Sequence, residues 1–295
     1  MQARSARFMT AAGSALMFGN TKILGQGALD AIKRSRPIYH AGRSLRFAVG
    51  ARLGARRVEG ISGRVHYNDF MLTSTNPADV AHYSRGATAF AAILERSCIE
   101  AGRDQNSITD VLEVGCGYGR IVRELRKRIP SARIHVCDAI EHAARFTATE
   151  FGARCIPLLE QAGDKLDGQF DLVYLLSVYT HLRRDMIVAN LRKVAAVLKP
   201  GGVTVITLQG QGSAEMAERY KLYWLDKAEL LQSLARDGYY YTKYPYYYSD
   251  YGMTWFSRAA FEQLVRETAP DLSLVTLTPM GLDGHQDVAV YRKAV

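Results

Sequence analysis

The sequence predicts an α/β protein built on a doubly wound, mostly parallel sheet. Three observations lead to this fold class. From about residue 78, short apolar and β-branched segments alternate with helical segments of ten to fifteen residues. The apolar segments, of which 169–178 is the clearest, are nearly continuous, as in strands that are buried on both faces. A glycine-rich turn joins the first predicted strand to the helix that follows it.

The predicted elements follow one another in a regular order. A long helix covers 77–102, with Pro77 at its start and Gly102 after its end. Ser257 is the predicted N-cap of a late helix over 257–270. The remaining helices are predicted over 121–129, 141–152 and 184–198, and the strands over 108–114, 133–139, 153–159, 169–178, 203–208, 272–280 and 287–295.

Composition divides the chain into two parts. With 48% apolar and 23% charged residues, its 295 residues are typical of a globular protein, which excludes disorder throughout. The formal net charge of +9 is uneven, because residues 1–64 carry twelve basic side chains against Asp30 and Glu59. The sequence therefore predicts a basic N-terminal arm over 1–65 and one domain over 66–295.

The arm leaves several interpretations open. Its first residues are Arg-containing and acid-free, like a transit peptide, but lack the apolar core of a secretory signal. The stretch 42–57 interleaves apolar residues with five arginines, which suits an anionic membrane surface or polymer, or simply a solvated arm. No apolar run approaches the roughly 20 residues of a membrane span. The four cysteines show no metal or disulfide spacing, so a reducing compartment is expected.

The most informative motif is Glu113-Val-Gly115-Cys-Gly117-Tyr-Gly119, at the end of the first strand. Closely spaced glycines let the backbone approach a ligand at a helix N-terminus, where amide groups favour nucleotide-like ligands. Asp138 ends the second strand, where a carboxylate can accept hydrogen bonds from ribose hydroxyls. A plain βα turn, a nicotinamide-binding turn and a helix-capping role for Asp138 remain as alternatives.

Together with FDLVYLLSVYTHL at 170–182 and LKPGG at 198–202, this motif resembles the class I S-adenosylmethionine (SAM)-dependent methyltransferases. The resemblance covers about 66–295. It implies a Rossmann-like sheet of seven strands, parallel except for an antiparallel last strand, with SAM as cofactor. The segments GRIVREL, EFGA, VYTHL and GHQDVAVYRK are similar to a bacterial subgroup associated with cell-surface polysaccharide or secondary-metabolite synthesis.

The resemblance also implies roles for individual residues. The glycine turn would line the methionine and ribose portions of SAM, Asp138 would bind the ribose, and the two residues after it would flank the adenine. Glu113 would shape the turn or lie on the methionine side, and Tyr83 would either reach over the methionine end or pack in the core. The residues expected at the cofactor are Glu113, Gly115, Cys116, Gly117, Gly119, Asp138, Ala139, Ile140, Ser177 and Tyr83.

Methyl transfer to a hydroxyl also needs a base, because the acceptor must lose a proton. In a doubly wound fold the loop after the fourth strand lies beside the methyl donor, so His181 is the first candidate base and Tyr179 a candidate acceptor contact. Capping or packing is the alternative for His181. His285, in the loop 281–287 on the same face, is a second candidate base or acceptor contact, or part of a polar turn. The loop lacks the Pro-Pro motif of amino-methylating nucleic-acid enzymes, and no metal site is predicted.

The segment 208–257 interrupts the alternation and contains an unusual density of tyrosines. Eight of the 17 tyrosines lie between 239 and 251, after a capped helix that begins at Asp226 and ends at Gly238. Rings with one polar edge suit a lid that stacks on a sugar or aromatic acceptor. Packing onto their own domain and a dimer contact are the alternatives. The rings expected at the acceptor are Tyr246, Tyr247 and Tyr248.

The favoured function is SAM-dependent methyl transfer, to oxygen, on a carbohydrate or another small polar metabolite. A nucleic-acid-binding methyltransferase or module that uses the arm and the tyrosines is one rival, although nucleic acid is the less favoured partner. A catalytically idle scaffold is the other. The expected location is the cytoplasm, with the arm able to contact an anionic membrane surface. The acceptor and the oligomeric state stay undetermined.

Overall fold

The computed structural model describes residues 65–295, except 67, 73, 75, 221, 223 and 246–249, together with seven isolated positions between 35 and 45. The predictions about the basic arm therefore lie outside the described residues, as do those about Tyr246, Tyr247 and Tyr248. Within the described part, no helix is long and apolar enough to cross a membrane.

A seven-stranded sheet forms the centre of the domain, with strand order β3-β2-β1-β4-β5-β9-β8. Strands β1 to β5 are parallel, and β9 runs antiparallel to both β5 and β8. The predicted α/β fold with a reversed last strand is confirmed. The strands are β1 (Asp110–Val114), β2 (Arg133–Cys137), β3 (Arg154–Cys155), β4 (Phe170–Leu175), β5 (Leu198–Leu208), β8 (Leu272–Leu282) and β9 (Gln286–Lys293).

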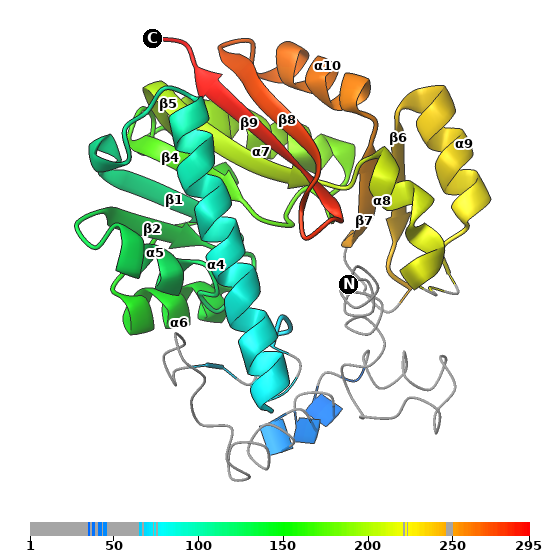
Figure 1. Cartoon of the computed structure of the whole chain (residues 1–295), viewed down its shortest axis with the longest axis horizontal. Helices are drawn as coiled ribbons and strands as arrows, with labels where there is room; N and C mark the ends of the chain where they lie inside the picture. The colour runs from blue at the N-terminus through cyan, green and yellow to red at the C-terminus, as the bar shows by residue number, and fades with distance from the viewer. Residues whose placement is uncertain are drawn as a thin grey trace.

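Helices cover both faces of this sheet (Figure 1). The long α4 (Pro77–Glu100) and α5 (Val122–Arg128) lie on one face, and α7 (Arg184–Val197) and α10 (Arg258–Thr268) on the other, while α6 (Glu141–Phe151) flanks β2 and β3. Every residue of β1 and β4 is buried, which explains why their sequences are mostly apolar apart from Asp110, Glu113 and Asp171. Local signals set the helix ends, since the Asn76 side chain accepts from the Asp79 amide at the start of α4.

The insertion after β5 forms a small unit with its own core (Figure 1). It contains α8 (Gln211–Glu215), α9 (Lys227–Asp237) and an antiparallel hairpin of β6 (Tyr239–Lys243) and β7 (Gly252–Phe256). Asp226 caps α9 by accepting from the Glu229 amide, and left-handed Gly238 ends it, as the sequence predicts. Trp255 is the largest buried side chain of this core.

The tyrosines of β6 alternate between two environments. Tyr240 faces the core of the insertion and packs against Trp255, whereas Tyr239 packs against Phe256 on the other side. The hydroxyls of Tyr239, Tyr240 and Tyr241 are paired respectively with the Arg184 amide, the Glu229 carboxylate and the Asp250 carbonyl. Tyr239 therefore attaches the insertion to α7 of its own domain, whereas Tyr240 and Tyr241 form hydrogen bonds within the insertion. For these three rings the structure shows packing, the alternative to a lid role that the sequence left open.

A buried cluster of charges ties the amino ends of the strands together. The Asp171 carboxylate, at the start of β4, accepts from the Thr109 and Asp110 amides at the start of β1, at 3.1 and 3.0 Å. It also pairs with Lys199 at 2.8 Å and Arg103 at 2.9 Å. Burial alone would raise the pKa of Asp171, but the hydrogen bonds from Lys199 and these amides outweigh it and lower the pKa.

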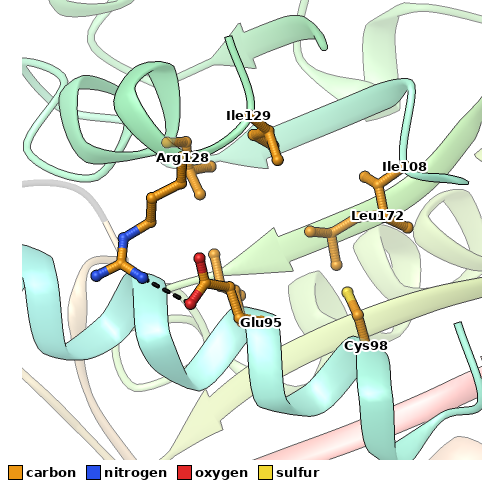
Figure 2. A pocket seen from close by; sticks show the side chains of 8 residues that line it. Glu95, Cys98, Ile108, Arg128, Ile129 and Leu172 are labelled. Carbon is orange, nitrogen blue, oxygen red and sulfur yellow. Dashed lines mark hydrogen bonds and ion pairs between the residues drawn. The ribbon is translucent and has the colours of Figure 1, made fainter. Parts of the chain in front are cut away.

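A small apolar cavity lies between α4 and α5, over β4 (Figure 2). An ion pair between Arg128 and Glu95, at 2.6 Å, spans its edge. Burial raises the pKa of the Cys98 thiol in its wall to about 11, so this thiol is protonated at neutral pH. The cavity borders the amino end of β1, away from the glycine turn that follows the carboxyl end. Its lining residues are Leu94, Glu95, Cys98, Ile108, Leu125, Arg128, Ile129 and Leu172.

Replacing Asp171 by Asn should destabilise the fold by about 1–3 kcal/mol at pH 7, because a buried carboxylate paired with Lys199 and Arg103 is lost. The folded-state pKa of Asp171 lies below its unfolded value of about 3.9, so this stabilisation is complete above that value and is lost as the pH falls through the folded pKa. Urea unfolding at several pH values measures the difference in free energy of unfolding between wild type and variant. If this difference in stability does not shrink in acid, the ionised Asp171 carboxylate does not stabilise the fold in this way.

Candidate functional site

The glycine turn lies at the carboxyl end of β1 with three left-handed residues: Gly115 (φ 78°), Gly117 (φ 50°) and Gly119 (φ 77°). A Cβ on Gly119 would lie 2.5 Å from the Phe151 ring, and one on Gly115 would lie 2.5 Å from Val178, so these positions are close-packed. A Cβ on Gly117 would meet nothing within 4 Å. Gly117 therefore faces the open space of the turn, where a ligand would lie against the backbone.

Asp138, at the end of β2, holds this turn in place. Its Oδ2 accepts from the Gly117 amide at 2.8 Å, and its Oδ1 accepts from the Ile140 amide at 2.7 Å. The Thr147 hydroxyl donates to the Gly117 carbonyl at 3.0 Å. Burial raises the pKa of Asp138, and each of its oxygens retains a second lone pair for a ligand donor. The side chain does not cap α6, because the N-cap of α6 is Ile140.

The neighbours of the turn divide into exposed and buried residues. Ala139 and Ile140 are exposed, and Ile140 presents 40% of its surface, an apolar face beside Asp138. Cys116 and Glu113 are buried, so their side chains shape the turn from inside the protein. Glu113 accepts from the Tyr174 hydroxyl at 2.9 Å, and burial raises its pKa well above the usual range.

The end of β4 contains a backbone conformation that is unusual for a side-chain-bearing residue. Ser177 has φ 57°, and three contacts hold it there. Its amide donates to the Thr207 hydroxyl at 2.8 Å, its carbonyl accepts from Thr180 at 2.8 Å, and its hydroxyl lies 3.0–3.1 Å from the Gln286 amide group. Such strain clusters at functional sites. Sequence reasoning missed Thr207 and Gln286, although both are polar residues in or beside apolar strands.

His181 lies four residues further along this loop, half-buried against the hairpin of the insertion. Its Nδ1 is 2.9 Å from the Gly252 carbonyl and 3.1 Å from the Tyr244 hydroxyl, and the Tyr251 ring lies over it at 4.8 Å. The Gly252 amide in turn donates to the His181 carbonyl at 3.1 Å, so β7 runs along the loop. Burial lowers the pKa of His181, although the hydrogen bond to Gly252 opposes this shift, so the ring is neutral at pH 7.

His285, in the turn between β8 and β9, lies against α8. Its Nε2 is 3.5 Å from the Ser213 hydroxyl, and burial lowers its pKa to about 4. Ser213 lies 3.5 Å from Gln209, whose amide donates to the Thr180 carbonyl in the loop of His181. The two candidate histidines therefore belong to one polar region at the carboxyl edge of the sheet.

Two tyrosines predicted at the site lie inside the core. Tyr179 is fully buried, and its hydroxyl donates to Asn190 of α7 at 2.9 Å, so the acceptor role assigned to Tyr179 is wrong. A side chain inside the core has no surface to offer an acceptor. Tyr83 is also fully buried; its hydroxyl donates to Asp69 at 2.6 Å, and Arg120 lies over its ring. Tyr83 therefore packs in the core, which is one of the two roles that the sequence left open for it.

Comparison with known proteins finds a methyltransferase-like region within the domain. Residues 112–204, from β1 into β5, match a family model described as a methyltransferase domain. This match and the fold support a SAM-dependent methyltransferase. No curated protein matches the chain.

Solved structures with the same fold span most of the methyltransferase domain. One is a 1,6-didemethyltoxoflavin-N1-methyltransferase from Burkholderia thailandensis, with 17% identity, a TM-score of 0.50, and coverage of 74% of this chain and 82% of that chain. Another is a SAM-dependent methyltransferase from Clostridium acetobutylicum, with 12% identity, a TM-score of 0.51, and coverage of 74% and 99%. At these identities the similarity concerns the fold.

The residues at the carboxyl edge fit SAM as the methyl donor. Gly117 leaves the open space that a side chain would fill, and the two oxygens of Asp138 can accept from ribose hydroxyls. Exposed Ile140 provides an apolar surface of the kind that an adenine ring covers. When bound, SAM supplies an activated methyl group, and the protein must align and deprotonate the acceptor.

Replacing Gly117 by Ala should weaken binding of S-adenosylhomocysteine (SAH) by about tenfold or more, about 1.4 kcal/mol, because the new Cβ occupies the open space beside Gly117 where the cofactor would lie. The fold should survive, since that Cβ meets no protein atom and the left-handed φ costs only about 1–2 kcal/mol. Calorimetry and thermal melting measure both effects. Gly119→Ala is the matched contrast, because its Cβ would strike Phe151 and lower the melting temperature. If Gly117→Ala binds SAH as tightly as the wild type, the cofactor does not lie against Gly117.

Replacing Asp138 by Ala should reduce SAH affinity by about 1–3 kcal/mol, because the ribose hydroxyls and the Gly117 amide lose their charged acceptor. Asp138→Asn keeps one side-chain carbonyl oxygen and should lose less. Calorimetric titration of folded variants orders the three proteins as wild type, Asn, Ala. Equal affinities would remove Asp138 from the site.

Proposed function

We propose that this enzyme transfers the methyl group of SAM to an oxygen of a small polar acceptor, such as a carbohydrate, with His181 as the general base. The observation that carries the proposal is the contact between His181 Nδ1 and the Gly252 carbonyl at 2.9 Å. A carbonyl oxygen can only accept, so Nδ1 bears the proton and Nε2 is the basic nitrogen. A neutral imidazole with a lowered pKa is suited to take a proton from a hydroxyl at neutral pH.

The position of His181 in the fold supports this role. The loop that carries it follows β4, directly beside the strand that leads into the glycine turn, because β1 pairs with β4. Strained Ser177 lies between that strand end and His181. In a doubly wound sheet, ligands bind outside the carboxyl ends of such adjacent strands. The base and the methyl donor would then approach the acceptor from the same edge.

The insertion offers an aromatic surface for the acceptor. Tyr244 lies edge-on to Trp224 at 5.3 Å and within 5.4 Å of Tyr251, whose side chain is 37% exposed. Aromatic faces of this kind stack on sugars and on planar ligands. We assign the acceptor lid to this surface together with Tyr246, Tyr247 and Tyr248, which follow Tyr244 closely in the sequence.

A small-molecule acceptor agrees with the Burkholderia thailandensis structure, which contains 1,6-didemethyltoxoflavin and SAH. His285 is assigned as a second polar contact for the acceptor, because Gln209 and Ser213 link it to the loop of His181. The basic arm over 1–64 would bring the enzyme to an anionic surface, in the cytoplasm or at a membrane. Nucleic acid remains the less favoured partner.

The decisive experiment is incubation of the full chain with labelled SAM and fractionated small metabolites, glycans and RNA, followed by mass spectrometry. A product heavier by one methylene in a metabolite or glycan fraction supports the proposal. Label in the RNA fraction alone would favour the nucleic-acid rival. Failure of the protein to bind SAH in calorimetry would support an idle scaffold. Gly117→Ala is the negative control, since its new Cβ fills the space where the cofactor would lie.

Replacing His181 by Asn should lower kcat by about 10²–10⁴-fold with unchanged SAH affinity, because the amide replaces the donor to Gly252 but not the basic Nε2. The wild-type rate should rise with pH through a pKa below 6.5, and the variant should lose this limb. Steady-state kinetics across pH on the identified acceptor measure both effects. His285→Asn is the matched control, and a larger rate loss there than at His181 would reassign the base.

A further inference from the structure

A short segment before α4 covers the tip of the glycine turn. We call residues 65–72, without 67, the strap. Within it, the Asn68 amide donates to His66 Nδ1 at 3.1 Å and the Asp69 amide to the His66 carbonyl at 3.0 Å, so the strap is a compact turn. Leu72 is fully buried beside Tyr83 and anchors the strap to α4. The strap contains none of the motifs that carry the family resemblance, and it lies outside the matched region 112–204.

The strap meets the glycine turn at Tyr118, which lies between Gly117 and Gly119. The His66 ring stacks on the Tyr118 ring with centroids 4.4 Å apart and planes 5° from parallel. The Tyr118 hydroxyl accepts from Asn68 Nδ2 at 3.0 Å and lies 2.6 Å from His142 Nε2 on α6. Only 4% of Tyr118 is exposed. We call these four side chains the Tyr118 clasp.

The clasp completes the set of contacts that hold the cofactor turn. Asp138 and Thr147 fix the amide and the carbonyl of Gly117. The next residue, Tyr118, is fixed by the clasp through its side chain, so a shift of its ring would rotate the Gly117 peptide that faces the ligand. The strap therefore contacts the cofactor turn through the side chain of Tyr118.

The burial of Asn68 against Tyr118 lowers the stability of the fold. Its side chain is 4% exposed, and among the residues that the structure describes its Oδ1 has no hydrogen-bond partner. A buried acceptor without a partner destabilises a fold, so an apolar side chain of the same shape would be tolerated or even stabilising there. The side-chain Nδ2 of Asn68 donates to the Tyr118 hydroxyl in the glycine turn.

We propose that Asn68 and His66 of the strap are positioning residues for the cofactor turn, acting through Tyr118. The clasp pre-orders the turn in its binding conformation, so that SAM does not have to order it on binding. This inference rests on the proposed SAM-dependent function. It adds a determinant of cofactor affinity that lies outside the glycine motif.

The test measures SAH affinity by calorimetry and stability by thermal melting on the wild type and four variants. Tyr118→Phe keeps the ring stacked on His66 but removes the hydroxyl, and Asn68→Leu removes its donor. Each should weaken SAH binding about three- to tenfold. The double variant should bind no more weakly than the weaker single variant, because both changes remove the same hydrogen bond. Tyr291→Phe is the control, since it removes a buried hydroxyl in β9 that has no hydrogen-bond partner in the described structure.

The melting temperature separates positioning from packing. For a positioning role, Asn68→Leu melts at or above the wild-type temperature while its SAH affinity falls. For a purely structural role, it melts earlier and the folded fraction binds SAH as the wild type does, which would overturn the proposal. Additive losses in the double variant would also overturn it. If the wild type itself binds no SAH, the SAM-dependent function fails before the clasp is tested.

Discussion

The pairing of β1 with β4 is the constraint on which the site depends. Val111 lies beside Leu172, and Glu113 beside Tyr174, so the turn after β1 and the loop after β4 leave the sheet next to each other. β1 pairs with β2 on its other side, so the chain crosses over from one direction to the other at this point. Ligands bind at such switch points because the diverging connections leave room between them. The cofactor turn and the candidate base are neighbours for this reason.

The two ends of the sheet use buried polar groups in opposite ways. At the amino end, Asp171 pairs with Arg103, and the hydrogen bonds from Lys199 and two backbone amides outweigh its burial and lower its pKa. At the carboxyl end, Asp138 has a raised pKa and is held by two backbone amides with acceptor capacity to spare. Fully satisfied charges stabilise a fold, whereas partly satisfied ones are suited to ligands. This contrast supports a candidate site at the carboxyl ends of the strands.

The hairpin of the insertion packs against its own core and against the loop of the proposed base. Its inner tyrosines, such as Tyr240, build a small core around Trp255. Its second strand extends along the loop of His181 through backbone hydrogen bonds, and Tyr244 and Tyr251 lie over that ring. The same hairpin that is anchored by its tyrosines therefore orients the proposed base. Its stability and the geometry of the site are coupled.

The strands and helices of the central sheet, the glycine turn and the acidic end of β2 could be predicted from the sequence, because these signals lie in contiguous residues. Periodicity, capping at Asn76 or Asp226 and glycine spacing act within a few residues of chain. The folded chain was needed to show that Tyr179 points into the core, that Ser177 is strained, that Gly252 sets the tautomer of His181, and that Asn68 reaches Tyr118. Each of these depends on partners brought together by the fold from distant positions, such as Asn190 for Tyr179 or Gln286 for Ser177, and no local pattern records which partner a side chain will meet.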